Sequence, residues 1–293
     1  MRVKKPEDIF ETIANDYSIC FTDVEKASAF QSPFQKVEIV NTKSLGKIFR
    51  LDGCNMTSEI DEFLYHEPMN HIGLLAQDNP KTALIIGGGD GGSVDEILKH
   101  PSIEKIVLVE LDPEVIRISQ EDFQKVNNNA FASPKLEVVI EDGYTWLPRA
   151  HRQNLKFDMV VMDLTDPIGP SEALYTSNFF KLIKNVLAES GCMSIHIGHA
   201  FFHRSRFVNT IISLQEIFKF VCPLHVSIPL YGGDWGMAIV SDQVKASSIP
   251  KDVYAKRINQ RKLQDLQWLN PECLLASFAL PNYLLKLINS AND

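Results

Sequence analysis

The chain has 293 residues, of which 45% are hydrophobic and 23% are charged, as is typical of a globular protein with one large domain or a domain and a smaller companion. Its net charge of -8 argues against nonspecific nucleic-acid binding, which depends on a basic surface. No stretch approaches about 18 uncharged apolar residues and no signal peptide is recognisable, so we expect no membrane segment, and five cysteines without a C-x-x-C pair predict reduced thiols in the cytoplasm.

The first part of the chain contains short runs in which apolar and polar residues alternate. Residues 36–40 and 47–51 have this pattern, and turn-forming residues separate them. We therefore expect residues 1–67 to form a small N-terminal domain of antiparallel β-strands.

From residue 68 onwards, short apolar runs alternate with helical segments. The apolar runs are 82–87, 105–111, 136–142, 158–164 and 192–197, helices are expected at 93–100, 113–123 and 177–188, and 281–288 is expected to be an amphipathic surface helix. Such alternation predicts an α/β domain over residues 68–293, with a parallel sheet covered by helices on both faces. Ligands of these sheets bind beyond the carboxyl ends of the strands.

The first of these strands ends in the glycine-rich segment GGGDGG, residues 87–92. Gly87, Gly89 and Gly92 satisfy the dinucleotide pattern G-x-G-x-x-G, in which a helix N-terminus receives a pyrophosphate. The carboxylate of Asp90 would repel that group by about 4 kcal/mol at ~4 Å and an effective dielectric constant near ~20. Asp90 therefore favours a cationic ligand, such as a nucleoside that carries a sulfonium and an ammonium.

The following strands also end in carboxylates, which are Glu110 and Asp112, then Asp142, then Asp163 and Asp166. Each acid alone also fits a local role, such as a helix N-cap for Asp112 or a turn for Asp166. Their recurrence at successive strand ends favours a shared ligand site. Glu110 lies at the spacing from the glycine loop where an acid commonly binds ribose hydroxyls, and Asp142 is placed to accept a hydrogen bond from an adenine amino group.

The histidines do not predict a metal site. His66 and His71 are five residues apart, and we expect Pro68 to interrupt the helix that they would have to share. The three histidines within 196–203 lie where a strand runs into a loop, without a carboxylate or cysteine that would complete a ligand set. We therefore expect no bound metal.

Several motifs resemble the spermidine synthase (polyamine aminopropyltransferase) family along nearly the whole chain. The most specific are DEFLYHE, GGGDGG and DLTDPIGP, which occur in this order and are accompanied by SPFQKVEI (32–39), LDG (51–53), VELD (109–112), EDGYTWL (141–147), LYTSNFF (174–180), YGGDWG (231–236) and SFALP (277–281). The resemblance implies an N-terminal β-stranded domain and a Rossmann-like, methyltransferase-type catalytic domain, in a homodimer or homotetramer.

The resemblance also implies an activity. Members of this family transfer the aminopropyl group of decarboxylated S-adenosylmethionine to a diamine or polyamine and release methylthioadenosine. Decarboxylated S-adenosylmethionine is then a co-substrate, putrescine is the expected acceptor, and neither a permanent cofactor nor a metal is implied.

The matching positions carry the implied roles. Residues implied for the donor are Gln35, Gly87, Gly89, Asp90, Glu110, Asp142 and Gly143, and those implied for the acceptor are Tyr65, His66, Asp90, Asp163, Asp166 and Tyr231. Asp90 would bind the ammonium of the donor's aminopropyl arm. Asp163 would orient and deprotonate the acceptor amine.

Three positions depart from the family's pattern, because Met56 and His196 stand where a glutamine is common and Leu164 stands where a serine is common. The acceptor is therefore left open among putrescine, cadaverine, agmatine and longer polyamines. Two other functions also stay open, namely a diamine N-methyltransferase that uses intact S-adenosylmethionine and a non-catalytic nucleoside-binding homologue. The co-product distinguishes the methyltransferase, and the absence of any product distinguishes the non-catalytic protein.

Overall fold

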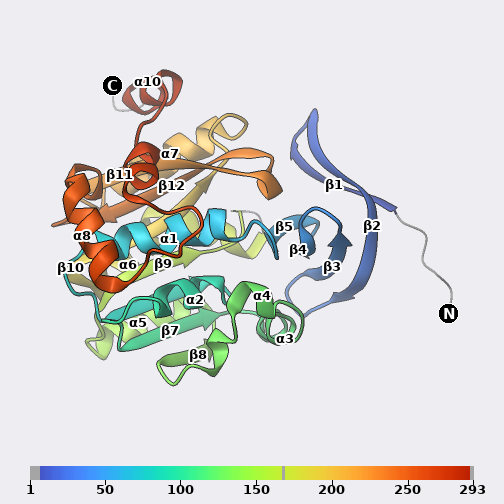
Figure 1. The fold of residues 1–293 in the computed structure, drawn as a ribbon, viewed down its shortest axis with the longest axis horizontal. Coiled ribbons are helices and arrows are strands. Elements are labelled where there is room, and N and C mark those ends of the chain that lie inside the picture. Colours follow the sequence, from blue (N-terminus) through green and yellow to red (C-terminus); the bar gives the residue numbers. More distant parts are fainter. Residues whose placement is uncertain (1–6, 167–168, 291–293) are drawn as a thin grey trace.

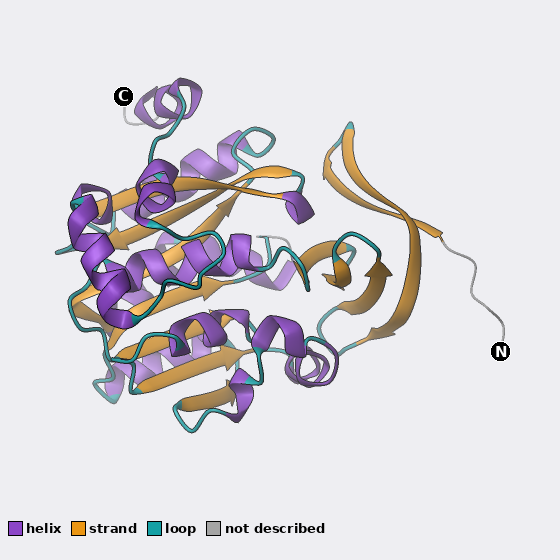
Figure 2. Ribbon diagram, in the orientation of Figure 1, coloured by secondary structure: helices purple, strands orange, loops and turns teal. Residues whose placement is uncertain are grey.

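The computed structural model describes residues 7–166 and 169–290 and contains two β-sheets. The smaller, N-terminal sheet lies beside the carboxyl ends of the strands of the larger sheet (Figures 1 and 2). A five-stranded sheet has the order β1-β2-β3-β4-β5, and a seven-stranded sheet has the order β11-β12-β10-β9-β6-β7-β8 with helices on both faces. The α/β fold with a Rossmann-like, methyltransferase-type sheet and a small N-terminal antiparallel β-sheet is thus confirmed.

The N-terminal sheet consists entirely of antiparallel neighbours. Its strands are β1 (Glu7–Ala14), β2 (Tyr17–Gln31), β3 (Lys36–Thr42), β4 (Gly46–Leu51) and β5 (Cys54–Ser58). The strands predicted at 36–40 and 47–51 are therefore confirmed as β3 and β4. The sequence pattern did not predict β1 and β2, which form the long outer hairpin drawn in blue in Figure 1.

The larger sheet is mixed rather than wholly parallel. Its strands are β6 (Thr82–Gly87), β7 (Lys105–Glu110), β8 (Leu136–Ile140), β9 (Phe157–Asp163), β10 (Leu187–Gly198), β11 (Phe220–Ile228) and β12 (Gly233–Ser241). Strands β8, β7, β6, β9 and β10 pair in parallel, as predicted. Strand β12 runs antiparallel to both β10 and β11, because the two last strands form a hairpin that the analysis of apolar runs missed.

The helices pack on both faces of this sheet or beside its ends. They are α1 (Phe63–Leu75), α2 (Gly92–Leu98), α3 (Pro113–Asp122), α4 (Gln124–Asn127), α5 (Gly143–Arg152), α6 (Ser177–Val186), α7 (Arg204–Gln215), α8 (Lys251–Arg261), α9 (Pro271–Ser277) and α10 (Asn282–Ser290). The helices predicted at 93–100, 113–123 and 177–188 correspond to α2, α3 and α6. Within the described residues, none of the helices is long and apolar enough to cross a lipid bilayer.

Helix α1 continues through Pro68, so the prediction that this proline interrupts the helix is wrong. Pro68 has no amide proton to donate to the preceding turn, which weakens a helix. However, every residue from 65 to 75 is buried. The tertiary packing of these eleven residues offsets the loss of one backbone hydrogen bond. The domain boundary predicted after residue 67 falls within α1, and the division into two domains stays a prediction.

Glu67 anchors helix α1 to a segment far along the chain. Its carboxylate accepts hydrogen bonds from the backbone amides of Gln267, Trp268 and Leu269 at 2.7, 2.9 and 2.8 Å. The side chain is only 2% exposed, so these amides are what satisfies its buried charge. The segment between α8 and α9 is thereby attached to the helix that carries Tyr65.

A second buried group of charges joins α1, α2 and α8, and we call it the ion cluster (His71, Glu96, Lys99, His100 and Arg261). His71 Nε2 lies 2.7 Å from Glu96 Oε2, and Lys99 Nζ lies 2.7 Å from Glu96 Oε1. Burial alone would raise the pKa of Glu96, but these two partners outweigh it and lower the pKa to about 2. His71 Nδ1 is hydrogen-bonded to His100, which lies 3.2 Å from the guanidinium of Arg261. Glu96, the one acid of this cluster, is therefore held by both His71 and Lys99.

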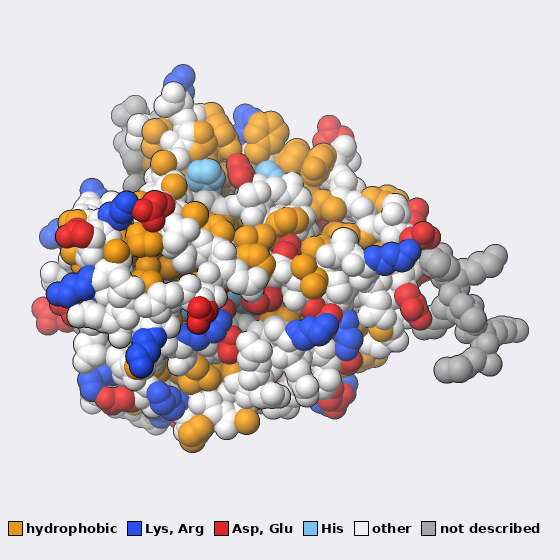
Figure 3. Space-filling model, in the orientation of Figure 1, with side chains coloured by type: hydrophobic (Ala, Val, Ile, Leu, Met, Phe, Trp, Pro, Cys, Tyr) orange, Lys and Arg blue, Asp and Glu red, His pale blue; other side chains and the backbone are white. Residues whose placement is uncertain are grey.

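Charged side chains are mixed on the outer surface. On the face drawn in Figure 3, lysines and arginines are scattered among acidic and apolar side chains and do not form a continuous basic stripe. This distribution agrees with the acidic net charge.

Candidate active site

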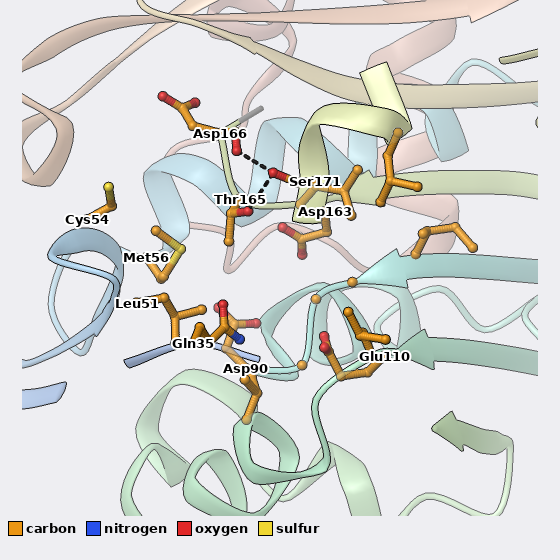
Figure 4. A pocket seen from close by; sticks show the side chains of 18 of the residues that line it. Gln35, Leu51, Cys54, Met56, Asp90, Glu110, Asp163, Thr165, Asp166 and Ser171 are labelled. Atoms are coloured by element: carbon orange, nitrogen blue, oxygen red, sulfur yellow. Dashed lines mark hydrogen bonds between the residues drawn. The ribbon is translucent and has the colours of Figure 1, made fainter. Parts of the chain in front are cut away.

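A cavity of about 240 Å³ lies beyond the carboxyl ends of β6, β7 and β9, where these strands face β4 and β5 (Figure 4). The predicted site residues that line it are Gln35, Tyr65, Gly87, Gly89, Asp90, Glu110, Asp142, Gly143, Asp163, Asp166 and Tyr231. His66 does not line the cavity but contacts Asp90 from behind. The structure thus brings the predicted residues together at one place, and Met56, Leu164 and His196 line the same cavity.

The loop between β6 and α2 brings Asp90 into the cavity. Gly87 and Gly91 have φ angles of 78° and 82°, in the left-handed region that glycine adopts without strain. A Cβ atom on Gly87 would also collide with the backbone carbonyl of Asp163. The amide of Gly92 donates a hydrogen bond of 3.0 Å to Asp90 Oδ1, which fixes the carboxylate at the start of α2.

His66 is held between two carboxylates. Its Nδ1 lies 2.7 Å from Glu62 Oε2, its Nε2 lies 3.4 Å from Asp90 Oδ2, and its ring packs on Gly92. Burial alone would lower the pKa of His66, but Asp90 and Glu62 outweigh it and raise the pKa well above the usual value. An imidazolium donates from both nitrogens, so this geometry fits a cationic His66.

The carboxylate of Asp163 points into the cavity and accepts two hydrogen bonds (Figure 4). Tyr65 Oη donates to Oδ1 at 2.9 Å, and Ser93 Oγ donates to Oδ2 at 2.6 Å. Burial and the neighbouring charge of Asp90 raise the pKa of Asp163, while His66, Ser93 and Tyr65 oppose that rise. Asp163 is therefore oriented by neutral donors and is a better proton acceptor than an exposed aspartate.

Negative charge is concentrated where Asp90 and Asp163 approach each other. Among residues 7–166 and 169–290, His66, Asp90 and Asp163 are the one group of three potential cation-binding side chains whose nearest polar atoms all lie within 4.8 Å. The hydrogen bonds from His66, Gly92, Tyr65 and Ser93 account for the positions of these carboxylates. The arrangement suits an organic cation, which can bind both acids through N–H donors.

Glu110 lies at the other end of the cavity, beside the glycine loop. Its Oε1 accepts a hydrogen bond of 2.9 Å from the backbone amide of Asp112, and the side chain is 8% exposed. Burial raises the pKa of Glu110 to about 7, and the charge of Asp112 acts in the same direction. A Cβ atom on Gly89 would lie 2.8 Å from Glu110 Oε2, so glycine is needed there for the carboxylate to keep its position. A pair of hydroxyl donors on a ligand would satisfy this carboxylate.

Gln35 is held beside Glu110 by Asp112. Gln35 Nε2 donates to Asp112 Oδ2 at 3.1 Å, and Ser32 Oγ donates to the same oxygen at 2.6 Å. The other oxygen of Asp112 caps α3 by accepting the amide of Glu114 at 3.0 Å. The N-cap interpretation of Asp112 is therefore confirmed, and this residue also ties the N-terminal sheet to the larger one.

Asp142 and Gly143 line the cavity where β8 leads into α5. Asp142 caps α5 by accepting a hydrogen bond of 2.9 Å from the amide of Tyr144. A Cβ atom on Gly143 would lie 3.1 Å from Ile86, so the backbone here stays close to β6. Asp142 therefore borders the same cavity as Gln35 and Glu110.

Aromatic side chains form the wall on the far side of Asp163. The ring of Tyr231 lies 6.0 Å from that of Tyr65 and 4.6 Å from that of Trp235, and Trp235 stacks on His196 at 5.8 Å. Tyr231 Oη donates to the backbone carbonyl of Met56 at 2.5 Å. This end of the cavity therefore has an apolar and aromatic lining suited to a methylene chain.

Two further acids, Asp166 and Glu11, border the same end of the cavity. Asp166 pairs with Arg206, whose Nη1 lies 2.7 Å from Oδ2, and in Figure 4 its carboxylate points away from Asp163. Glu11, on β1, lines the cavity, and burial raises its pKa to about 7. The sequence analysis identified neither Glu11 nor Arg206, because no motif marks them and their positions follow from tertiary packing. Residues 167 and 168 of the DLTDPIGP motif lie outside the described residues.

Comparisons with known proteins agree with this geometry. The sequence model described as the spermine/spermidine synthase domain matches residues 62–250. A polyamine aminopropyltransferase from Nitrosomonas europaea is 36% identical over 279 residues, covering 95% of this chain and 85% of that protein. A thermospermine synthase from Arabidopsis thaliana is 34% identical over 275 residues, covering 92% of this chain and 79% of that protein.

Solved structures give the same result. A spermidine synthase in complex with the transition-state analogue AdoDATO superposes with a TM-score of 0.90 at 30% identity, covering 99% of this chain and 98% of that chain. The spermidine synthase from Thermotoga maritima superposes with a TM-score of 0.89 at 30% identity, with the same coverage.

Proposed function

Because the chain belongs to the spermine/spermidine synthase family and is a polyamine aminopropyltransferase, we propose that it transfers the aminopropyl group of decarboxylated S-adenosylmethionine to putrescine, giving spermidine and methylthioadenosine. The observation that carries this proposal is the convergence of Asp90 and Asp163 on one cavity. Two partly buried carboxylates that approach each other, with His66 behind Asp90, favour a donor and an acceptor that are both cations.

The donor would lie along the glycine loop. Glu110 would bind the two ribose hydroxyls, with Gln35 beside it, and Asp142 would accept the adenine amino group. Gly87, Gly89 and Gly143 support this because they line the cavity, and their lack of a side chain lets the backbone pack closely against Asp163, Glu110 and Ile86.

Asp90 would bind the ammonium at the end of the donor's aminopropyl arm. Its carboxylate is fixed by Gly92 and faces the cavity next to Asp163. A donor that kept its α-carboxylate would bring a second negative charge to Asp90 and be repelled. This preference supports aminopropyl transfer over methyl transfer from intact S-adenosylmethionine.

The reaction is a displacement at the carbon next to the sulfonium, and the leaving thioether is neutral. The attacking amine must be unprotonated, which costs about 4–5 kcal/mol at pH 7 for an amine with a pKa near ~10.4. Asp163 would hold this amine in line and accept its proton as the C–N bond forms. The raised pKa of Asp163 supports that role, and the hydrogen bonds from Tyr65 and Ser93 keep the carboxylate aimed into the cavity.

The acceptor chain would lie between the aromatic wall and Met56. Tyr65 and Tyr231 border this space, and Leu164 lines it with an apolar side chain. His66 would act from behind Asp90, by balancing its charge. Asp166 would lie near the acceptor's second ammonium.

The test is incubation of the purified protein with decarboxylated S-adenosylmethionine or S-adenosylmethionine and a panel of putrescine, cadaverine, agmatine and spermidine, with products identified by mass. We expect methylthioadenosine and spermidine from putrescine. S-adenosylhomocysteine with a methylated diamine would identify a methyltransferase instead. Nucleoside binding without any product would identify a non-catalytic homologue.

We also propose that the protein is cytoplasmic and forms a homodimer or homotetramer. Its five cysteines are free, as expected for a reducing compartment. The outer hairpin β1–β2 and the loop that follows expose Phe10, Tyr17 and Phe34, whose apolar surface would be covered by a second copy. Light scattering after size-exclusion chromatography gives the mass, and a monomer would overturn this assignment.

A further inference from the structure

A cation, Arg206, lies beside the acids at the far end of the acceptor space. Asp166 borders the cavity, yet one of its oxygens is taken by Arg206, which lies 40 residues later at the start of α7. The guanidinium donates at 2.7 Å, and both side chains are partly buried, at 23% and 20% exposed for Arg206 and Asp166. Such a charge-assisted hydrogen bond in a partly buried position is a stable feature of the site.

The second oxygen of Asp166 has no hydrogen-bond partner in the part of the chain that the structure describes. Oδ1 is shielded from solvent and accepts no hydrogen bond among the described residues. A buried carboxylate oxygen without a donor is costly, so a cation that reached Oδ1 would relieve this cost. A ligand ammonium that binds Oδ1 would share a single carboxylate with the guanidinium of Arg206.

We propose that Arg206 is a specificity-determining residue, which weakens the binding of the acceptor's second ammonium by occupying Asp166. This inference rests on the proposed function, in which Asp166 lies near that ammonium. Arg206 contacts Asp166 and is not among the described residues that line the cavity, whereas the reacting amine would bind near Asp163. Its charge therefore acts on the choice and affinity of the acceptor, with little effect on the chemical step.

Glu11 strengthens this interpretation. It lines the same end of the cavity, and the charge of Asp166 adds to burial in raising its pKa. The local charge thus depends on how many acids are ionised and how many cations are already bound. Arg206 offsets part of this negative charge, because it pairs with Asp166.

The experiment compares two amines that differ only in the second ammonium. Putrescine has it, and n-butylamine has the same four-carbon chain without it. The KM for putrescine and the inhibition constant of n-butylamine are measured at saturating donor for the wild type and for Arg206→Gln. The glutamine keeps a hydrogen-bond donor near Asp166 and removes the charge.

We expect Arg206→Gln to lower the KM for putrescine about tenfold and to leave the inhibition constant of n-butylamine unchanged. About tenfold is the expected effect of removing one like charge near the bound ammonium in a partly solvated site. Arg206→Lys should restore the wild-type KM, since it keeps the charge. Arg204→Gln is the matched control: Arg204 lies on the same turn, is exposed and contacts Phe201, so both constants should stay at wild-type values.

An unchanged or raised KM for putrescine in Arg206→Gln would overturn the proposal. Equal changes for both amines would also overturn it, because a merely structural role does not distinguish a diamine from a monoamine. If the wild type transfers no aminopropyl group to any amine, the proposed function fails instead, and this outcome is recognised before any variant is compared.

Discussion

Helix α1 contributes a histidine to each of two groups of charges, and the carboxylates of the two groups behave in opposite ways. In the ion cluster, Glu96 is paired with His71 and Lys99, and its pKa is lowered to about 2. In the cavity, acids outnumber cations, and the pKa of Asp163 is raised. Burial is common to both groups, so the balance of charge makes the difference.

The comparison shows that a buried acid can either stabilise the fold or bind a ligand. A paired acid is satisfied in the free protein and holds elements together. An acid in excess has no cation to balance its charge in the free protein, and it destabilises the fold until a cation or a hydroxyl donor binds. The cavity contains three acids of this second kind, namely Glu11, Glu110 and Asp163, each with a raised pKa.

The largest effect is expected when the central acid of the cavity loses its charge. Asp163→Asn should reduce turnover by about a thousandfold, because the amide positions the amine but accepts no proton. Binding of methylthioadenosine, measured by calorimetry, should be unchanged. Asp158→Asn on the same strand is the control, since Asp158 binds the backbone of Lys81 and Thr82 away from the cavity. A variant at position 163 with a tenth or more of wild-type turnover would remove Asp163 from the catalytic role.

Removal of the paired acid should affect stability instead. Glu96→Ala leaves His71 and Lys99 without their buried partner and should lower the free energy of unfolding by about 3–5 kcal/mol in urea titrations. Glu104→Ala is the matched control: its pair with Lys81 is exposed, so its loss should cost under about 1 kcal/mol.

The stability that Glu96 provides should also depend on pH. Its folded-state pKa is below the usual value of 4.5, so the contribution is complete above pH 4.5 and is lost as pH falls towards 2. The difference between wild type and Glu96→Ala should shrink over that range. Equal destabilisation by Glu96→Ala and Glu104→Ala at pH 7 would contradict the role given to the ion cluster.

Glu110, the acid without a cationic partner at the nucleoside end of the cavity, should affect the pH dependence of stability in the opposite direction to Glu96. The pKa of Glu110 is raised from 4.5 to about 7, so its ionisation destabilises the fold increasingly between these two pH values and fully above pH 7. Glu110→Gln should therefore stabilise the free protein by about 2–3 kcal/mol at pH 8 and hardly at all at pH 4.5. It should also weaken binding of methylthioadenosine at least about tenfold.

Thermal or urea unfolding at the two pH values checks the stability, and calorimetry checks the binding. Glu137→Gln, on the exposed edge strand β8, should change neither quantity. A loss of stability in Glu110→Gln at pH 8 would mean that its carboxylate is paired after all.

The smallest effect is expected at Glu11. Its pKa of about 7 means that it gains charge as pH rises from 6 to 8. The ratio of the putrescine KM of Glu11→Gln to that of the wild type should therefore rise about threefold over this range, since only the wild type gains an attractive charge. A ratio that does not change with pH would place the acceptor away from β1.

The sequence was sufficient to predict the central strands and the acids that follow them. Short apolar runs followed by Asp90, Glu110 or Asp163 are local patterns, and the carboxyl ends of parallel strands necessarily meet at one edge. That rule is why residues 73 positions apart along the chain, such as Asp90 and Asp163, could be predicted to share a cavity.

Other features depend on packing that no local pattern reveals. The rule that proline ends a helix failed at Pro68, because burial of α1 outweighs one missing hydrogen bond. Arg206 reaches Asp166 only because α7 follows β10 beside it, and Glu11 reaches the cavity only because β1 folds back along β2. Neither residue stands out from its neighbours in the sequence.

The attachment of Glu67 to residues 267–269 has a consequence for biosynthesis. During translation this carboxylate leaves the ribosome some 200 residues before the amides that it binds. Trp235 is the last residue that lines the cavity, so all lining residues are synthesised before residue 267. At that stage helix α1, which carries Tyr65, still lacks the backbone amides that bind Glu67. Nascent chains stalled before residue 267 should therefore be inactive, and activity should appear abruptly once the final segment has emerged from the ribosome.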